Sequence, residues 1–381
     1  MRGNIQGKLA KALVYGLLTG LFTLLLLSPP SFAEVRIGLA APLSGPDAVF
    51  GIELRNGAEQ AAADINATGG VRGQKLVIVA ADDRGELKQA LNVANRFVAE
   101  KISLVIGHFQ SSLTLAASEI YANHSILDIT ASATNPQITE RGLDLMFRTC
   151  GRDDQQSAVA ATFLEARTEK RIAIVYDNTA SGKKRADDLR ARLAKAGIAD
   201  VLYAGIDKDG DDGGLVGRIK AAAADVVYWS GDGNDAGQLV KEMRAEGVRA
   251  LFVGSDSLAS DEFALAGGSA VEGALMTFPT DPRHSPQAAA VMREFKARKI
   301  DLEVFTLYAY AAVEVLAQAA EAAGTFEPAA IAKAIHSGRP FKTVLGTLTY
   351  DAKGDVTTPD YQIYVWKRGY EDQLEYDETS R

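Results

Sequence analysis

The sequence predicts an α/β protein with two lobes, each built on a doubly wound parallel sheet. Short aliphatic runs alternate with longer amphipathic segments, and strands that are apolar throughout are typical of parallel sheets covered on both faces. The alternation occurs in two series of similar size, the second beginning after Arg152. With 381 residues, the chain is also too long for one compact core, which favours two lobes of ordinary domain size.

The first series predicts strands and helices in regular alternation. Its strands are expected where four to six aliphatic residues follow one another, at residues 35–40, 76–79, 104–107 and 126–129. Its helices are expected where apolar residues recur at helical spacing, over residues 57–66, 87–100 and 114–123. The first helix should stop at Gly69 and Gly70, because glycine commonly ends helices.

The second series repeats this order. Its strands are expected at residues 171–176, 201–206, 225–229 and 250–254. Its helices are expected over residues 184–196, 215–223 and 236–247. A long helix should follow at 302–323, and late strands at 346–350 and 361–367 should complete one lobe or the other.

The late elements imply that the chain crosses between the lobes more than once, and several crossings make a hinge. We expect the first lobe to comprise residues 34–152 and 278–362. The second lobe should comprise residues 153–277 and 363–381.

Residues 2–33 have the pattern of a secretory signal peptide. Three basic residues, Arg2, Lys8 and Lys11, precede an apolar run at 12–27, and Ser31 and Ala33 place small side chains at the positions that specify cleavage. We expect export to the periplasm and cleavage near Ala33. The alternative is an uncleaved membrane anchor, but the run is shorter than the roughly 20 residues that span a bilayer.

Charge and cysteine content exclude several classes of partner. The chain has 41 Lys and Arg against 49 Asp and Glu, a net charge of −8, and loss of a signal with three basic and no acidic residues changes this to −11. Such an acidic excess disfavours nucleic acid and anionic membrane surfaces as partners.

Cys150 is the single cysteine, so we expect no intramolecular disulfide. We also expect Cys150 to be a small buried residue rather than a nucleophile.

No motif predicts catalysis, a metal or a cofactor. The histidines have neither metal-ligand nor nucleophile–base spacing, and they stand at His108, His124, His284 and His336. The acidic run at 207–213 begins like a calcium loop, but Asp212 stands where that loop requires Gly and Arg218 where it requires Glu. We therefore expect a solvated turn there and a protein without enzymatic activity.

Loops rich in hydroxyls and glycines follow the expected strands. Ligands of doubly wound sheets bind at the carboxyl ends of the strands, where loops enter helices, and hydroxyls with backbone N–H groups suit an anionic group on a small ligand. The alternative for each hydroxyl is an ordinary helix N-cap. The loops concerned contain Ser44-Gly45, Ser111-Ser112, Thr130 with Ser132 and Thr134, Ser181-Gly182, Ser230-Gly231 and Ser255.

Over nearly all of its exported length the chain resembles the periplasmic branched-chain amino-acid binding proteins, the type I substrate-binding subunits of ABC importers, and five segments carry the resemblance. The segments are IGLAAPLSGPDAVFG at 37–51, GAEQAAADINATGGVRG at 57–73, VIGHFQSS at 105–112, RIAIVYD at 171–177 and GTLTYDAKG at 346–354. The resemblance implies two lobes that are joined by three crossover strands and close on a ligand. It also implies delivery of that ligand to a membrane permease, by a monomer that needs no cofactor.

The resemblance implies ligand contacts in the first lobe. The loop after residue 107 supplies a hydroxyl for the ligand carboxylate, at Ser111. The loop after residue 129 supplies Ser132, Ala133 and Thr134 for the carboxylate and the ammonium together. A pocket aromatic near the first loop matches Phe50.

The implied contacts of the second lobe depart from the family's pattern. The acidic residue that pairs with the ammonium matches Asp256, one methylene shorter than the usual glutamate. Two positions that are usually tyrosine in leucine-binding members are Ser181 and Asp232. Two carboxylates facing an apolar side chain without a cation would be costly. Asp232 therefore either shares ammonium recognition or favours a polar, larger or cationic ligand, unless it is an exposed rim residue.

Three classes of function follow. The leading hypothesis is import of a small amino acid, branched-chain favoured. The alternative is a ligand-sensing protein of the same fold for an amide, a polar amino acid or an aromatic carboxylate, which passes the signal to a partner protein. An exported hydrolase is a third class, but no nucleophile–base arrangement supports it.

Overall fold

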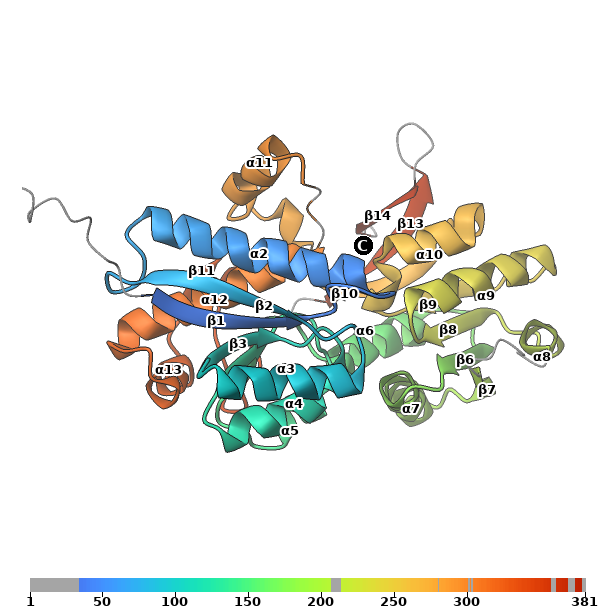
Figure 1. The fold of residues 1–381 in the computed structure, drawn as a ribbon. Coiled ribbons are helices and arrows are strands. Elements are labelled where there is room, and N and C mark those ends of the chain that lie inside the picture. The colour runs from blue at the N-terminus through green and yellow to red at the C-terminus, as the bar shows by residue number, and fades with distance from the viewer. Residues whose placement is uncertain are drawn as a thin grey trace, which may run out of the picture.

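The computed structural model describes residues 34–206, 214–279, 281–300, 302, 304–357, 361–368 and 374–378. The expected signal peptide and the acidic run at 207–213 lie outside the described residues. Two sheets, one of five strands and one of seven, form the centres of two α/β bodies that lie side by side (Figure 1). The predicted fold class of two sheet-centred α/β lobes is therefore confirmed.

The five-stranded sheet is wholly parallel in the order β2-β1-β3-β4-β5. Its strands are β1 Glu34–Ala41, β2 Lys75–Asp82, β3 Leu104–Gly107, β4 Leu127–Thr130 and β5 Met146–Arg148. One face packs on α3 (Leu87–Ala99) and α4 (Ser111–Asn123) through residues such as Phe97 and Tyr121. The other face packs on α2 (Ala48–Ala67) and α12 (Val304–Ala323), and α5 (Gln137–Glu140), α11 (Ala289–Ala297) and α13 (Pro328–Ile335) flank this body.

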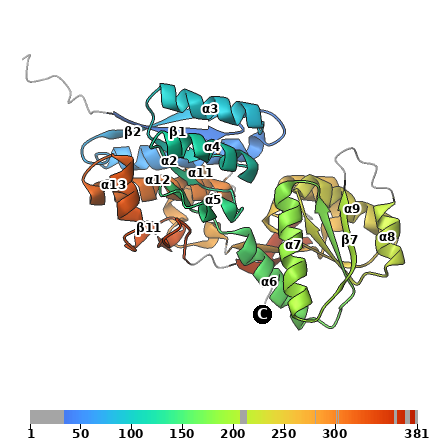
Figure 2. The ribbon, with the colours of Figure 1, turned by 90° about the horizontal axis from the view of Figure 1, so that it is seen from below.

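The seven-stranded sheet is mixed, in the order β14-β13-β10-β9-β8-β6-β7. Its strands are β6 Ile172–Asp177, β7 Asp200–Ile206, β8 Val226–Ser230, β9 Leu251–Gly254, β10 Leu275–Pro279, β13 Tyr361–Arg368 and β14 Leu374–Glu378. The last two strands pair antiparallel, and the others pair parallel. One face packs on α6 (Asp153–Ala166) and α7 (Ala180–Lys195), and the other on α8 (Leu215–Ala221), α9 (Gly233–Ala245) and α10 (Asp261–Gly267) (Figure 2).

The chain passes between the two sheets three times. It leaves the first sheet after β5, returns after β10 so that α12 can pack on α2, and enters the second sheet again at β13. The expected lobe limits at 277/278 and 362/363 fall inside β10 and β13, both of which pair in the seven-stranded sheet. The lobe limits themselves stay a prediction.

Three of the differences between the structure and the predicted elements have a clear physical reason. Helix α2 begins at Ala48, well before residue 57, because Gly51 lets its first turn lie against the chain: a Cβ there would stand 1.9 Å from the carbonyl oxygen of Pro42. Helix α6 was not expected, since its first turn is entirely polar. The expected strand at 346–350 extends neither large sheet; β12 (Gly346–Leu348) instead pairs with β11 (Phe341–Thr343) in a separate hairpin.

Within the described residues, every helix is too short or too polar to cross a membrane. Cys150 is buried as predicted, and burial raises the pKa of its thiol to about 12.

Candidate ligand-binding site

Loops from the two sheets meet in the gap between them. A narrow pocket of about 20 Å³ is lined on one side by Val49, Phe50 and Glu53 of α2 and by Phe305, and on the other by residues 259–262 of the second body. Helices α4 and α7, which follow two of these loops, also lie close together across the gap. The hydroxyl-rich loops at the carboxyl ends of both sets of strands therefore face a common space.

Three aromatic rings form the wall of this gap on the side of α2. Phe50 stacks on Phe109, with ring centroids 4.7 Å apart and planes inclined by 10°. Phe305 meets both rings edge-on, at 5.9 Å from Phe50 and 5.5 Å from Phe109. Phe109 and Phe305 were missed by sequence reasoning, because they come from a loop and a helix that are nearly two hundred residues apart and neither carries a motif.

Ser111 lies beside the loop that carries residues 132–134. It is the first residue of α4, and its Oγ accepts a hydrogen bond of 3.3 Å from the backbone N–H of Asn135. The hydroxyl hydrogen of Ser111 is thus left to donate elsewhere. The beginning of α4 adds backbone N–H groups that have no partner within the helix, so this corner suits an anionic group.

The hydroxyls of Ser132 and Thr134 both donate hydrogen bonds to other groups of the protein. Ser132 Oγ donates to the carbonyl oxygen of Phe109 at 3.0 Å, and Thr134 Oγ1 donates to Oδ1 of Asp153 at 2.9 Å. A hydroxyl has one hydrogen and two lone pairs, so each can only accept from a further partner. Ala133 is buried, and its N–H donates to Thr130 Oγ1.

Arg148 supports this loop from behind. Its fully buried guanidinium donates to the carbonyl oxygens of Ala133 at 2.9 Å and Asn135 at 3.2 Å. Its Nε lies 2.6 Å from Oδ1 of Asp355, and Thr139 Oγ1 donates to the same carboxylate at 2.8 Å. An arginine at the end of an apolar strand was the signal in the sequence, and it was missed because its partners lie elsewhere in the chain.

Asp256 of the second body lies three residues before Ala259, which lines the pocket in the gap. It opens the 3₁₀ turn Asp256–Leu258, one residue beyond the end of β9, and it is half-buried. Gln156 of α6 holds it at both ends: Nε2 donates to Oδ2 of Asp256 at 2.8 Å, and Oε1 accepts from its backbone N–H at 3.1 Å. Burial raises the pKa of Asp256 to about 6, against the opposing effect of Arg185.

Arg185 supplies the cation that the sequence did not reveal. Its Nη1 donates to Oδ1 of Asp153 at 2.7 Å and its Nε to Oγ of Ser230 at 3.1 Å. Lys183 and Lys184 beside it are exposed, whereas Arg185 is 7% exposed. The signal was helical spacing, since Arg185 lies on the buried face of α7 with Gly182, Ala186 and Leu189.

Ser181 and Asp232 lie around a third carboxylate, that of Asp177. Ser181 is half-buried in the first turn of α7, and a Cβ on the next residue, Gly182, would stand 1.9 Å from Oδ1 of Asp177. Asp232 is exposed and caps α9 by accepting from the backbone N–H of Asp235 at 2.9 Å. Burial, together with the charge of Asp232, raises the pKa of Asp177.

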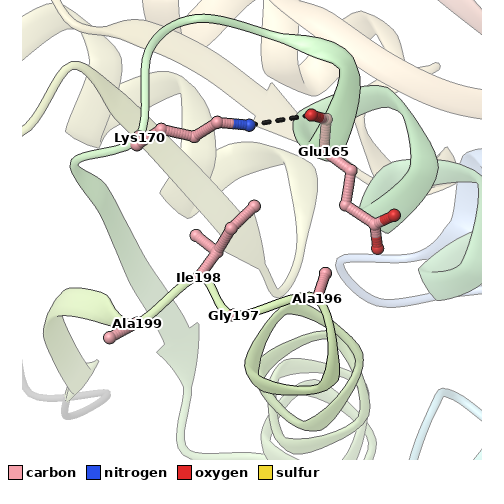
Figure 3. Close-up of a pocket in the computed structure, with 6 residues that line it drawn as sticks. All are labelled: Glu165, Lys170, Ala196, Gly197, Ile198 and Ala199. Carbon is pink, nitrogen blue, oxygen red and sulfur yellow. Dashed lines mark hydrogen bonds between the residues drawn. The ribbon is translucent and has the colours of Figure 1, made fainter.

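Two other features lie away from this gap. The open pocket in Figure 3, of about 560 Å³, lies at the opposite, amino ends of β6 and β7, where Lys170 Nζ donates to the carbonyl oxygen of Glu165 at 2.7 Å. His108 is fully buried, with Nδ1 2.6 Å from Asp83 and Nε2 3.1 Å from the hydroxyl of Tyr121. Within the described ranges, no group of His, Cys, Asp and Glu side chains could hold a metal ion.

Solved structures of amino-acid binding proteins share this architecture. A leucine-binding protein from Thermotoga maritima superposes with a TM-score of 0.81 at 24% identity, covering 90% of this chain and 97% of the other. A branched-chain amino acid transporter substrate-binding protein from Streptococcus pneumoniae, solved with isoleucine, has a TM-score of 0.78 at 23% identity, covering 91% of this chain and 100% of the other.

Sequence comparisons place the chain among named relatives. The chain is 42% identical over 348 residues to Leu/Ile/Val-binding protein homolog 1 of Brucella melitensis, covering 91% of this chain and 94% of the relative. It is 45% identical over 345 residues to an amino acid binding protein of Pseudomonas aeruginosa, covering 89% of this chain and 92% of the relative. The family model described as periplasmic binding protein matches residues 34–371. The chain therefore belongs to the periplasmic binding protein family.

Proposed function

We propose that this protein is the substrate-binding component of an ABC-type amino-acid importer, and that it binds one small amino acid between its lobes. The observation that carries the proposal is that hydrogen-bond donors and acceptors lie close together in the same gap. Ser111 and the N-terminus of α4 offer donors, whereas Thr134 and Asp256 offer acceptors. An α-amino acid has a carboxylate and an ammonium that need this pair of environments.

The same geometry orients the ligand. The α-carboxylate accepts from Ser111 and the first N–H groups of α4, and the ammonium donates to Thr134 and Asp256. Ser132 and Ala133 hold the shape of the loop that carries Thr134. The names of the relatives from Brucella support leucine, isoleucine or valine as the ligand, and Phe50 in the aromatic wall offers an apolar surface for such a side chain.

A polar or cationic ligand is the second candidate. Ser181 and Asp232 lie next to Asp177, so this corner of the gap has hydroxyl and carboxylate groups where an aliphatic side chain would find no partner. Such a corner suits an amide or an amino group on the ligand. If Asp232 only caps α9 and does not contact the ligand, aliphatic amino acids remain the favoured ligands.

We further infer the setting in which binding occurs. The signal peptide is cleaved near Ala33, the monomeric protein works in the periplasm, and a membrane permease receives the ligand. The two lobes, 34–152 with 278–362 and 153–277 with 363–381, close about the three crossings. Binding is not followed by turnover, because buried His108 is shielded from the gap and Cys150 keeps a protonated thiol at neutral pH.

Binding of amino acids is the first expected result. Protein from residue 34 onward, stripped of ligand by unfolding and refolding, should show a higher unfolding temperature with leucine, isoleucine or valine. The reason is that a ligand that binds the folded state stabilises it by RT ln(1 + [L]/Kd), about 2.7 kcal/mol at one hundred times Kd. Shifts with lysine, arginine or glutamine alone would support the second candidate. No shift with any amino acid, amide or aromatic carboxylate would contradict the proposal.

Affinity should also depend on pH. Asp256 must be ionised to pair with an ammonium, and its pKa is raised to about 6 in the ligand-free protein. A bound ammonium favours the ionised form, so the dissociation constant should rise about tenfold for each pH unit below about 6 and stay flat above it. Calorimetric titrations between pH 4.5 and 8 would measure this, and a profile that is flat down to pH 4.5 would exclude Asp256 as the partner of the ammonium.

A further inference from the structure

A buried ion pair joins the second body to the ligand loop of the first. Oδ1 of Asp153 accepts from Nη1 of Arg185 at 2.7 Å and from Oγ1 of Thr134 at 2.9 Å. The backbone N–H of Asp153 also donates to the carbonyl oxygen of Thr134 at 2.9 Å. Both ions are at least nine-tenths buried, so removing either one leaves an uncompensated charge in the interior.

The pair of Asp153 and Arg185 determines that the Thr134 hydroxyl can accept from a ligand but not donate to it. A carboxylate only accepts hydrogen bonds, so Asp153 takes the hydroxyl hydrogen and leaves the oxygen lone pairs of Thr134 for a ligand. A ligand ammonium is matched by this arrangement, and a ligand carboxylate is not. Arg185 keeps Asp153 in place for this purpose, and Ser230, whose own Oγ donates to the carbonyl oxygen of Gly182 at 2.7 Å, fixes the guanidinium in turn.

Arg185 also acts on Asp256. Several ionisable side chains surround the Asp256 carboxylate: Asp153 of α6, Arg185 of α7, Tyr228 of β8, Tyr308 of α12, Tyr361 of β13 and Cys150. Burial raises the pKa of each tyrosine and of the cysteine above its usual value, so these four stay neutral at physiological pH. Among the described neighbours of Asp256, the charged groups are therefore Asp153, which has the same sign, and Arg185, which has the opposite sign.

We propose that Arg185 is a positioning residue of the ligand site: it holds Asp153 against Thr134, so that this hydroxyl accepts from a ligand ammonium, and it balances the negative charge of Asp153 beside Asp256. This inference rests on the proposed amino-acid binding function. Arg185 acts through these three residues and needs no contact with the ligand.

The test compares Arg185→Met with the wild type and with Arg190→Met. Arg190 lies on the same helix but on its exposed side, where it pairs with Asp200 at 2.7 Å, so its loss is a matched control. Arg185→Met should weaken binding at pH 7 about tenfold or more and move the pH at which affinity falls upward by about one unit or more, because an opposite charge nearby lowers a carboxyl pKa by about 1–3 units. Arg185→Lys keeps the positive charge, so its affinity should fall at the same pH as that of the wild type. Arg190→Met should bind as the wild type does.

A second measurement does not depend on a ligand. The carboxyl ¹³C NMR signal of Asp256, assigned by its loss in Asp256→Asn, should titrate at higher pH in Arg185→Met than in wild type. If Arg185→Met does not fold, the double variant Arg185→Met/Asp153→Asn removes both buried charges and should still bind more weakly than wild type, since Thr134 loses the carboxylate that orients its hydroxyl.

The outcomes separate the two proposals. A wild type that binds amino acids, with the same affinity profile and the same Asp256 titration in Arg185→Met, would overturn the role of Arg185 alone. A wild type that binds no amino acid while the Asp256 titration shifts would overturn the proposed function and with it the positioning role, leaving a structural ion pair.

Discussion

Asp256→Asn is expected to abolish tight binding of the amino acid. The substitution keeps the size of the side chain and its hydrogen bond from Gln156, but it removes the negative charge opposite the ligand ammonium. Loss of one partner of a desolvated charge pair costs about 2–5 kcal/mol, which is roughly 30-fold or more in the dissociation constant. Isothermal titration calorimetry at pH 7.5 measures it directly.

A matched control separates this effect from a general loss of acidic charge. Asp188 also lies in the second body, but its half-buried carboxylate pairs with Arg192 of the same helix at 2.9 Å, so Asp188→Asn should leave affinity unchanged. The remaining binding of Asp256→Asn should no longer change between pH 5 and 7. Equal affinities for Asp256→Asn and wild type would place the ammonium elsewhere in the gap.

Arg148→Met should cause the largest loss of stability. Its guanidinium is fully buried and bridges Asp355 to the backbone carbonyls of Ala133 and Asn135. Breaking a buried ion pair by removing one partner costs about 3–5 kcal/mol. The loss here should lie at the lower end of this range, because Arg152 still pairs with Asp355 at 2.5 Å. We expect a clear fall in the unfolding temperature, together with weaker ligand binding, since the loop of residues 132–134 loses its support.

An exposed ion pair in the same body provides the comparison. Arg36 pairs with Glu100 at 2.6 Å, but its side chain is 44% exposed, so Arg36→Met should cost less than about 1 kcal/mol. Removing the charges of both partners in Arg148→Met/Asp355→Leu should recover part of the loss, because Arg152 keeps Glu140 and Asp154 as partners. Thermal unfolding followed by circular dichroism measures all three variants. A cost of Arg148→Met no larger than that of Arg36→Met would show that the buried pair adds no stability to the loop.

Much of the fold could be predicted because strands and helices of an α/β protein record their burial in local patterns. The expected strand at 104–107 coincides with β3, and the expected strand at 225–229 differs from β8 by one residue at each end. The late strand at 346–350 was placed wrongly, since a three-residue edge strand pairs with whatever backbone lies nearest, and its neighbour β11 has no strand pattern of its own. The start of α2 depended on a contact between Gly51 and Pro42 that no local pattern records.

The sequence by itself determined the α/β class, the two series of elements, the hydroxyl-rich loops and the resemblance to amino-acid binding proteins. These features follow from residues close together in the chain, where periodicity and turn chemistry act. Only the tertiary structure decided that Arg185 is buried rather than exposed beside Lys183, that it pairs with Asp153, and that Asp153 in turn takes the hydroxyl hydrogen of Thr134. The physical reason is that the charge, orientation and pKa of a polar group depend on its neighbours in space, which here come from different helices and strands on both sides of the gap.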